Sequence, residues 1–421
     1  MVVLQNKYLR IREIRGKFLK ALREFIHMET NYIRRGWGIK EAIQETLDRE
    51  FQSDLIDRIR GADYQLTEGN TTIKLAKEYG FCYGVDRSID YAYQTVRKFP
   101  GKKIYLTGEI IHNPYVNKRL IGMGVMFLSG QYNKGESLKD IRKEDIVILP
   151  AFGVSISLLE ELKQIGCILV DTTCGSVLNV WKHVKRFSND QFTALIHGKY
   201  YHEETIATAS QTELAEKHAY IIVRNFEETE RVCDYIGGKG DKIKFLTYFQ
   251  KAVSADFDPD RDLVKIGVAN QTTMLANESL KVAELVKEAL IDRYGAAVID
   301  DHFRSFDTIC SATQERQDAI IEMLESGVDL TIVIGGYNSS NTNNLTNIAV
   351  RYGPAFHIED ASAILDQEHI RHKIPDSSEL KTTTGWLPGG PLTIGITGGA
   401  STPDTKIEEV IAKILEFKGK G

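Results

Sequence analysis

The chain has 421 residues, of which 42% are hydrophobic and 26% are charged, and its formal net charge is −5. At roughly 150 residues per domain this length predicts about three domains, and the composition is typical of a soluble globular protein. No apolar run approaches the roughly 18 residues of a membrane span, and the negative charge disfavours nucleic-acid binding, which needs a concentrated basic surface. We therefore expect neither a membrane nor a nucleic acid as a partner.

Residues 1–70 are predicted to form a mainly helical N-terminal extension. Apolar residues within it recur at helical spacing, which indicates an amphipathic helix: Ile11, Ile14, Phe18, Leu22 and Phe25. Such a helix either packs on its own protein or offers a docking surface for an acidic electron donor. The segment lacks the apolar core of a secretory signal and is not rich in serine. We expect the cytoplasm of a bacterium, or the plastid stroma if the chain comes from a plant or an alga.

From about residue 70 onward, short apolar strands alternate with longer helical stretches. This alternation is typical of α/β units with mainly parallel sheets. The clearest strands are 103–106, 146–149, 167–170, 263–268, 330–334 and 392–396. Between them, 236–260 reads as a loop-rich excursion and 371–390 as a polar connection.

Three of the five cysteines, Cys82, Cys174 and Cys310, each precede a helical pattern. The last two also share a D-T-x-C motif, at 171–174 and 307–310. These cysteines lie about one domain apart. The spacing predicts three similar α/β lobes around one central site, with each lobe contributing a thiol; the expected limits are 71–173, 174–307 and 308–421.

An odd number of cysteines without C-x-x-C fits a reducing compartment and excludes short-spaced zinc fingers. A helix N-terminus lowers the pKa of a thiol, and thiolates at such positions are good iron ligands. Three thiol ligands would leave one iron of a cluster open to substrate. The alternative is that the three cysteines are small residues packed at helix starts. Cys167 and Cys233 lie inside a predicted strand and a predicted helix, and we expect them to be structural.

Polar loops follow three of the predicted strands, at 270–273, 335–342 and 398–403. A strand–loop–helix turn presents backbone N–H groups and hydroxyls to an anion, although helix capping alone also favours Ser, Thr and Asn. Neither nucleotide fingerprint, G-x-x-x-x-G-K-[ST] or G-x-G-x-x-G, occurs. Histidines and a carboxylate lie in two further turns, at His112 and at His202 to Glu204, which suggests a proton donor beside an anion.

Taken together, these segments resemble the 4-hydroxy-3-methylbut-2-enyl diphosphate reductases of the LytB family. The resemblance runs from about residue 31 to the C-terminus and is similar to the longer form of cyanobacteria and plants. The matching stretches are GFCYGV at 80–85, GEIIHNPYVN at 108–117, DTTC at 171–174, HEE at 202–204, NQTT at 270–273, DTICSATQER at 307–316, and the loops 335–342 and 398–403.

The resemblance implies an oxidoreductase of the non-mevalonate isoprenoid pathway, which removes the hydroxyl of its allylic diphosphate to give isopentenyl and dimethylallyl diphosphates. It implies a 4Fe–4S cluster on Cys82, Cys174 and Cys310, with Glu204 as proton donor. It also places Thr272 and Thr313 near the substrate hydroxyl. The diphosphate-binding positions that it implies are His112, His202, Ser339, Ser340, Asn341 and Ser401.

The chain departs from the family pattern at two positions. Phe152 stands where shorter bacterial members carry His, and Gly175 stands where Pro is usual after the cysteine. The family expectation for the electron donor is a ferredoxin or a flavodoxin. Two other readings stay open: a redox-neutral cluster enzyme such as quinolinate synthase, and a non-catalytic iron–sulfur sensor.

Overall fold

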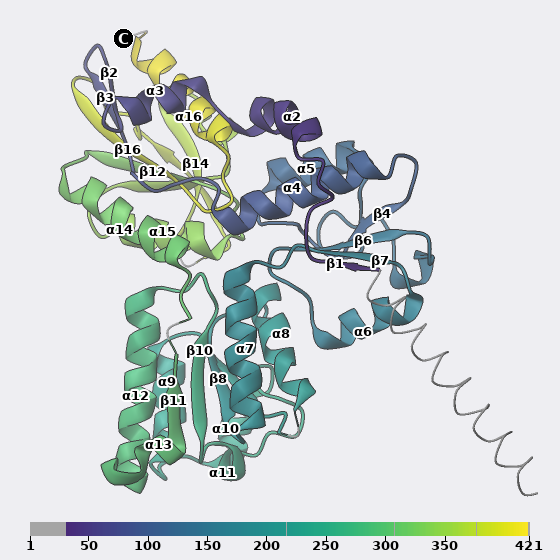
Figure 1. Ribbon diagram of the computed structural model, residues 1–421. Helices are drawn as coiled ribbons and strands as arrows, with labels where there is room; N and C mark the ends of the chain where they lie inside the picture. Colours follow the sequence, from purple (N-terminus) through teal and green to yellow (C-terminus); the bar gives the residue numbers. More distant parts are fainter. Residues whose placement is uncertain (1–30, 216, 307, 376, 420–421) are drawn as a thin grey trace, which may run out of the picture.

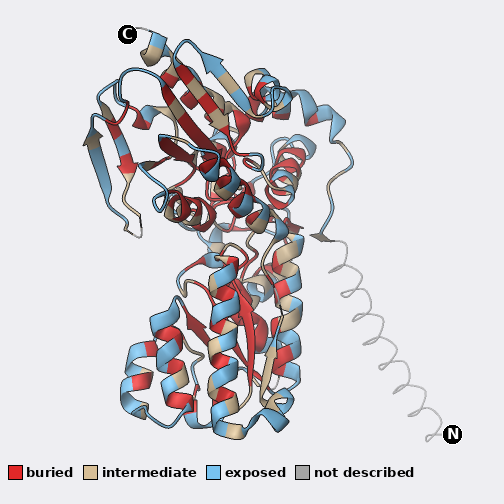
Figure 2. Cartoon of the chain, turned by 90° about the vertical axis from the view of Figure 1, so that its left-hand side faces the viewer, coloured by how far each residue is buried: buried red, intermediate tan, exposed pale blue. Residues whose placement is uncertain are grey.

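The computed structural model describes residues 31–419 except 216, 307 and 376. The predicted amphipathic helix at 11–25 and its docking role lie outside the described residues. Three separate sheets form the cores of three lobes, each flanked by helices, as the sequence predicts (Figure 1). Their inner strands are buried, whereas the helices expose their outer faces (Figure 2).

The first lobe is built on a five-stranded parallel sheet in the order β1-β7-β6-β4-β5. Its strands are β1 (Tyr32–Ile33), β4 (Ile104–Leu106), β5 (Met126–Phe127), β6 (Ile146–Leu149) and β7 (Ile168–Asp171). The helices of this lobe are α2 (Glu41–Phe51), α4 (Tyr83–Lys98), α5 (Pro114–Gly122) and α6 (Ile156–Ile165). Residues 32–33 therefore belong to a sheet, although the sequence places them in the N-terminal extension.

The second lobe has a four-stranded parallel sheet in the order β11-β10-β8-β9. Its strands are β8 (Thr193–His197), β9 (Tyr220–Val223), β10 (Ile266–Asn270) and β11 (Phe303–Ser305). Its helices are α7 (Gly175–Asn189), α8 (Glu203–Ala209), α9 (Phe226–Ile236), α10 (Lys242–Phe249), α11 (Pro259–Asp262), α12 (Ala276–Tyr294) and α13 (Ile299–His302).

The loop-rich excursion expected at 236–260 contains one helix, α10, that the sequence did not predict. Asp241 caps the start of α10, and Phe245 and Phe249 are buried in the core of the second lobe. Burial of these rings stabilises a helix of eight residues, which is too short to be recognised from apolar periodicity.

The third lobe has a seven-stranded mixed sheet in the order β15-β14-β13-β12-β16-β3-β2. Its strands are β2 (Gln65–Glu68), β3 (Thr71–Leu75), β12 (Leu330–Ile334), β13 (Ala355–Ile358), β14 (His369–Lys373), β15 (Leu380–Thr384) and β16 (Leu392–Gly398). Its helices are α3 (Asp54–Gly61), α14 (Ser311–Glu325), α15 (Ser340–Ala349) and α16 (Asp404–Gly419). The polar connection expected at 371–390 is instead largely an antiparallel edge hairpin, whose outer strand is mostly exposed and therefore polar.

Strand β3 pairs with β16 in parallel, so the sheet of the third lobe takes a strand from early in the chain. The expected limits assign 71–75 to the first lobe, whereas its strand partner is Leu392–Ile396. The division into domains at those limits stays a prediction. In the part of the chain that the structure describes, no helix combines the length and the apolar character needed to cross a bilayer.

Each of the three cysteines lies where the chain passes from one lobe to the next. Cys82 follows β3 of the third lobe, and the helix after it packs in the core of the first. Cys174 follows β7 of the first lobe and precedes α7, which packs in the second. Cys310 follows β11 of the second and precedes α14, which packs in the third. The three crossings meet at the centre of the molecule.

Candidate active site

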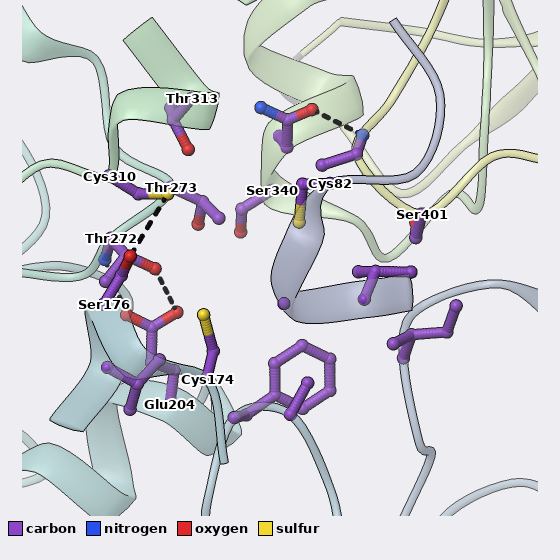
Figure 3. Close-up of a pocket in the computed structure, with 18 of the residues that line it drawn as sticks. Cys82, Cys174, Ser176, Glu204, Thr272, Thr273, Cys310, Thr313, Ser340 and Ser401 are labelled. Carbon is purple, nitrogen blue, oxygen red and sulfur yellow. Dashed lines mark hydrogen bonds between the residues drawn. The ribbon is translucent and has the colours of Figure 1, made fainter. Parts of the chain in front are cut away.

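Cys82, Cys174 and Cys310 occupy the N-cap positions of α4, α7 and α14. The backbone is extended at each cysteine, and none of the three thiols caps its own helix. All three side chains line one cavity between the lobes (Figure 3). All three are free thiols, so the cavity presents three sulfur ligands that are not consumed in a disulfide.

Close contacts join the helices that carry the thiols. A Cβ on Gly84 of α4 would meet the Cys174 Sγ at 2.5 Å, so the absence of a side chain permits this approach. Ser176 Oγ of α7 lies 3.5 Å from the Cys310 Sγ. Arg316 of α14 donates to the carbonyl of Gly80, two residues before Cys82. The contacts form a closed ring around the cavity, from α4 to α7 to α14 and back.

The loop that carries Cys174 is held from both sides. Arg87 of α4 donates to the carbonyl of Thr173 at 2.9 Å. On the other side, Asp171 accepts hydrogen bonds from the Tyr32 hydroxyl at 2.6 Å and from the Arg34 Nε at 3.0 Å. Asp171 also accepts from the backbone N–H of Thr173, so β1 contacts the cysteine loop through a single buried carboxylate.

The pKa of the Cys82 thiol is raised, although a helix N-terminus alone would lower it. Burial raises its pKa, and this effect exceeds the opposing effects of the Val85 N–H and the positive charge of Arg316. A positively charged metal centre stabilises thiolates in such a site. Three convergent thiols in a half-enclosed cavity fit an iron–sulfur cluster better than they fit isolated packing residues.

Glu204 points into the same cavity from the first turn of α8. Its carboxylate accepts from the Thr272 N–H at 2.6 Å and lies 3.0 Å from the Thr272 Oγ1. Burial raises the pKa of Glu204 to about 7, although the hydrogen bonds from Thr272 act in the opposite direction. A carboxyl with such a pKa still carries a proton near neutral pH, which is the state that a general acid needs.

A chain of hydrogen bonds connects the two histidines of the cavity. The His202 Nδ1 accepts from the Glu204 N–H at 3.2 Å, and burial lowers the pKa of His202 well below its usual value. The ring is therefore neutral with its proton on Nε2, which donates to the His112 Nε2 at 3.2 Å. The His112 Nδ1 then donates to Glu109 at 3.1 Å. These partners assign one tautomer to each ring.

Glu109 is buried and accepts further bonds from Gln131 and Asn338. Burial raises its pKa, but the hydrogen bonds from His112, Gln131 and Asn338 outweigh burial and lower it. A carboxylate thus orients the His112 ring by accepting from its Nδ1. Ring nitrogens of His112 and His202 and a carboxylate oxygen of Glu203 lie within 4.8 Å of one another, a grouping that could also hold a cation.

Phe152 is half-buried and lies against the two histidines. Its ring stacks on His112 with centroids 4.3 Å apart and meets His202 edge-on at 5.8 Å. The ring supplies no hydrogen bond, but it fixes the plane of the imidazole beside it.

The two Gly-rich loops approach each other at the carboxyl ends of β12 and β16. Ser339 caps α15, and Asn341 accepts from the Ala400 N–H at 2.9 Å. The Ser340 Oγ and the Asn341 Nδ2 are buried and have no hydrogen-bond partner in the described residues. Ser401 donates to the carbonyl of His112 at 3.2 Å. Buried donors without partners at a helix N-terminus form a cradle that an anion would satisfy.

The structure brings every predicted site residue to this cavity. The lining includes Cys82, His112, Cys174, His202, Glu204, Thr272, Cys310, Thr313, Ser339, Ser340, Asn341 and Ser401. Their roles stay predictions. Sequence reasoning gave no role to Glu109, Ser176 or Arg316. The sequence did contain a signal that Arg316 is buried. It lies one helical turn before Ile320, on the apolar face of α14.

Comparisons with known proteins identify the family of this chain. The sequence pattern of the family described as LytB protein matches residues 73–415. A relative from Gloeobacter violaceus, named 4-hydroxy-3-methylbut-2-enyl diphosphate reductase, is 47% identical over 93% of this chain and 94% of its own. A relative of the same name from a Synechococcus strain is 46% identical over 95% and 99%.

A solved structure has a similar fold. It is titled as the structure of the E-1-hydroxy-2-methyl-but-2-enyl-4-diphosphate reductase from Plasmodium falciparum, with 23% sequence identity and a TM-score of 0.58. The similarity covers 81% of this chain and 86% of that one. The family match extends over most of the chain and includes every residue of the cavity. The chain therefore belongs to the LytB protein family.

Proposed function

We propose that this chain is a 4-hydroxy-3-methylbut-2-enyl diphosphate reductase. The reaction replaces the allylic hydroxyl by hydrogen and gives isopentenyl and dimethylallyl diphosphates. Two electrons and two protons enter, and water leaves. The names of the curated relatives support this proposal. The observation that carries it is that three thiols, a protonated carboxyl and buried anion donors face one cavity.

A 4Fe–4S cluster is the group that the three thiols suit best, with Cys82, Cys174 and Cys310 as its ligands. When bound, it supplies single electrons and a Lewis-acidic iron without a cysteine ligand. The residues around it then have three tasks: they bind the diphosphate, orient the hydroxyl and deliver protons.

The diphosphate end of the substrate is assigned to the cradle beside α15. The Ser340 Oγ and the Asn341 Nδ2 donate to its oxygens, together with the backbone N–H groups of the helix start. Ser339 and Ser401 line the same pocket. His202 gives up its hydrogen bond to His112 and donates to the anion from Nε2, while Glu109 holds the His112 ring beside it. This anchoring holds the hydroxyl end toward the thiols.

Glu204 donates the proton with which the hydroxyl leaves as water. Hydroxide is a poor leaving group, so protonation at that oxygen removes a large part of the barrier. Thr272 and Thr313 are buried in the same cavity and orient the oxygen. Glu204 is itself buried, which shields its proton from bulk water. Electrons come from a ferredoxin or a flavodoxin.

The test is an oxygen-free assay in which a reduced viologen dye is oxidised when 4-hydroxy-3-methylbut-2-enyl diphosphate is added. We expect dye oxidation and both five-carbon diphosphates as products. Glu204→Gln keeps both contacts to Thr272, since its amide accepts from the N–H and donates to the Oγ1. We therefore expect this variant to hold its iron and lose turnover. Cluster-loaded wild-type protein that leaves the dye reduced would contradict the proposed reaction.

A further inference from the structure

Arg316 is a buried arginine on the inner face of α14, with only 3% of its surface exposed. Its Nη2 donates to the Gly80 carbonyl and its Nη1 donates to the Ala312 carbonyl, each at 2.8 Å. Gly80 lies two residues before Cys82, and Ala312 lies two residues after Cys310. One guanidinium therefore joins the chain segments that carry two of the three thiols.

The positive charge of Arg316 has no balancing carboxylate in the described part of the chain. The hydrogen-bond partners of the guanidinium are backbone carbonyls, and its Nε has none. Asp404 lies close to Gly80, but its carboxylate pairs with Arg60 at 2.8 Å. A buried charge without a counter-charge is strongly unfavourable, so native proteins pair buried charges almost without exception. A bound negative group would supply the counter-charge that the described residues do not provide.

The cavity beside Arg316 is where such a group would lie. Thr313, one turn earlier on α14, lines this cavity, and so does Cys82, which follows the carbonyl that Arg316 holds. A 4Fe–4S cluster with three thiolates carries a net negative charge, and this charge increases by one when the cluster is reduced. A fixed positive charge next to it stabilises the reduced form more than the oxidised form.

We propose that Arg316 is a positioning residue that balances the negative charge of the cluster, raises its reduction potential, and holds the Cys82 and Cys310 segments at the distance that the cluster requires. The proposal rests on the cluster of the proposed function. It assigns two separable contributions to one side chain. The charge acts on the potential, and the two carbonyl contacts act on retention of the cluster.

Three substitutions separate these contributions. Arg316→Met removes the charge and both contacts. Arg316→Gln removes the charge but keeps an amide that can reach one carbonyl. Arg316→Lys keeps the charge but loses the paired hydrogen bonds to the Gly80 and Ala312 carbonyls. Arg351→Met is the control, because it removes the charge of an exposed arginine just after α15, a charge that is solvated rather than buried.

The measurements are the reduction potential of the cluster, from a dye-coupled titration followed by electron paramagnetic resonance, and the rate of iron loss to a chelator. We expect a lower potential in the Met and Gln variants, a potential close to wild type in the Lys variant, and several-fold faster iron loss in all three. Arg351→Met should match the wild type in both. If Arg316→Met does not fold, Arg316→Gln and Arg316→Lys still compare a neutral with a positively charged side chain at this position.

A Met or Gln variant with the wild-type potential would overturn the proposal. So would a Lys variant shifted as far as the Met variant, because the charge would then not be the cause. Wild-type protein purified without oxygen that contains no iron and no sulfide would contradict the proposed function itself. Wild type with a cluster and variants without a shift would contradict the role of Arg316 alone.

Discussion

At the scale of single residues, Glu204 shows how an environment selects a protonation state. The carboxyl is buried, and its hydrogen bonds from Thr272 stabilise the ionised form less than burial destabilises it. The proton is therefore retained to a pH at which an ordinary glutamate has lost it.

The protonated form is the active one, which sets the sign of the pH dependence. We expect kcat/KM to be high at pH 6 and to fall as the pH rises through about 7. Glu204 has a pKa of about 7, so it loses the proton that it must donate as the pH passes that value. Stopped-flow rates of dye oxidation between pH 6 and 9 measure this fall in kcat/KM. A rate that stays flat over that range would exclude Glu204 as the acid.

Phe152 offers a second test at this scale. Phe152→Ala removes the ring stacked on His112, and an aromatic contact of this kind contributes about 0.5–1.5 kcal/mol. We expect KM for the diphosphate substrate to rise about twofold to tenfold with a smaller change in kcat. Phe152→His retains a ring in the same place and serves as the control. An unchanged KM in the Ala variant would mean that the stacking does not orient His112 for binding.

The sequence predicted the functional residues of the cavity, but not all the residues that hold them in place. The thiols and Glu204 lie in local motifs, so their residue types and spacing carry the information. Glu109 connects His112, three residues on, with Asn338, which is far away in the chain, and Arg316 donates to backbone carbonyls. Backbone carbonyls are the same at every position, so no local pattern reveals such a contact.

At the scale of secondary-structure elements, the approach of α4 to α7 depends on a glycine. Gly84→Ala would place a methyl group 2.5 Å from the Cys174 Sγ, so the two helix starts would have to separate. We expect this variant to fold but to hold much less iron than wild type, as measured by iron analysis and visible absorbance.

Gly175→Ala is the matched control, because a Cβ there meets nothing within 4 Å although it adjoins Cys174. It should retain the full iron content. Loss of iron in both variants, or in neither, would show that the close approach at Gly84 does not set the geometry of the thiols.

Strand β1 supports the Cys174 loop through Tyr32. Burial, followed by the adjacent Asp171, raises the pKa of the Tyr32 hydroxyl, which therefore stays a neutral donor. Tyr32→Phe removes one hydrogen bond to a buried carboxylate, a loss of about 1.5–3 kcal/mol. We expect a lower midpoint of thermal unfolding and faster iron loss. Tyr352→Phe alters an exposed tyrosine and should change neither quantity. A Tyr32→Phe variant as stable as wild type would show that β1 does not support the Cys174 loop.

Elements were predicted well where the pattern was long or fully apolar. The buried parallel strands and the helices after the three cysteines are of this kind. Helix α10 and the β14–β15 hairpin were missed, because a short helix and an exposed edge strand both lack a continuous apolar pattern.

At the scale of the whole molecule, three crossings between lobes converge on the thiols. A bound metal group would therefore join all three lobes at once, and its binding free energy would add to the stability of the native arrangement. We expect removal of iron by a chelator to lower the midpoint of thermal unfolding and to make the connections before the cysteines more sensitive to protease. A stripped protein with unchanged stability and proteolysis would mean that the lobes hold together without the metal.

The position of β16 constrains how the protein is made. This strand lies between β3 and β12, so the early strand has no parallel neighbour until Leu392 to Ile396 have been synthesised. The ribosome covers the most recent residues of a growing chain, and domains otherwise fold in the order in which they emerge. The first and second lobes can thus fold during translation, but the third sheet cannot close before nearly the whole chain is free. Because Cys82 and Cys310 both adjoin that lobe, we expect cluster delivery to follow release of the chain, so that an incomplete product carries no reactive iron centre.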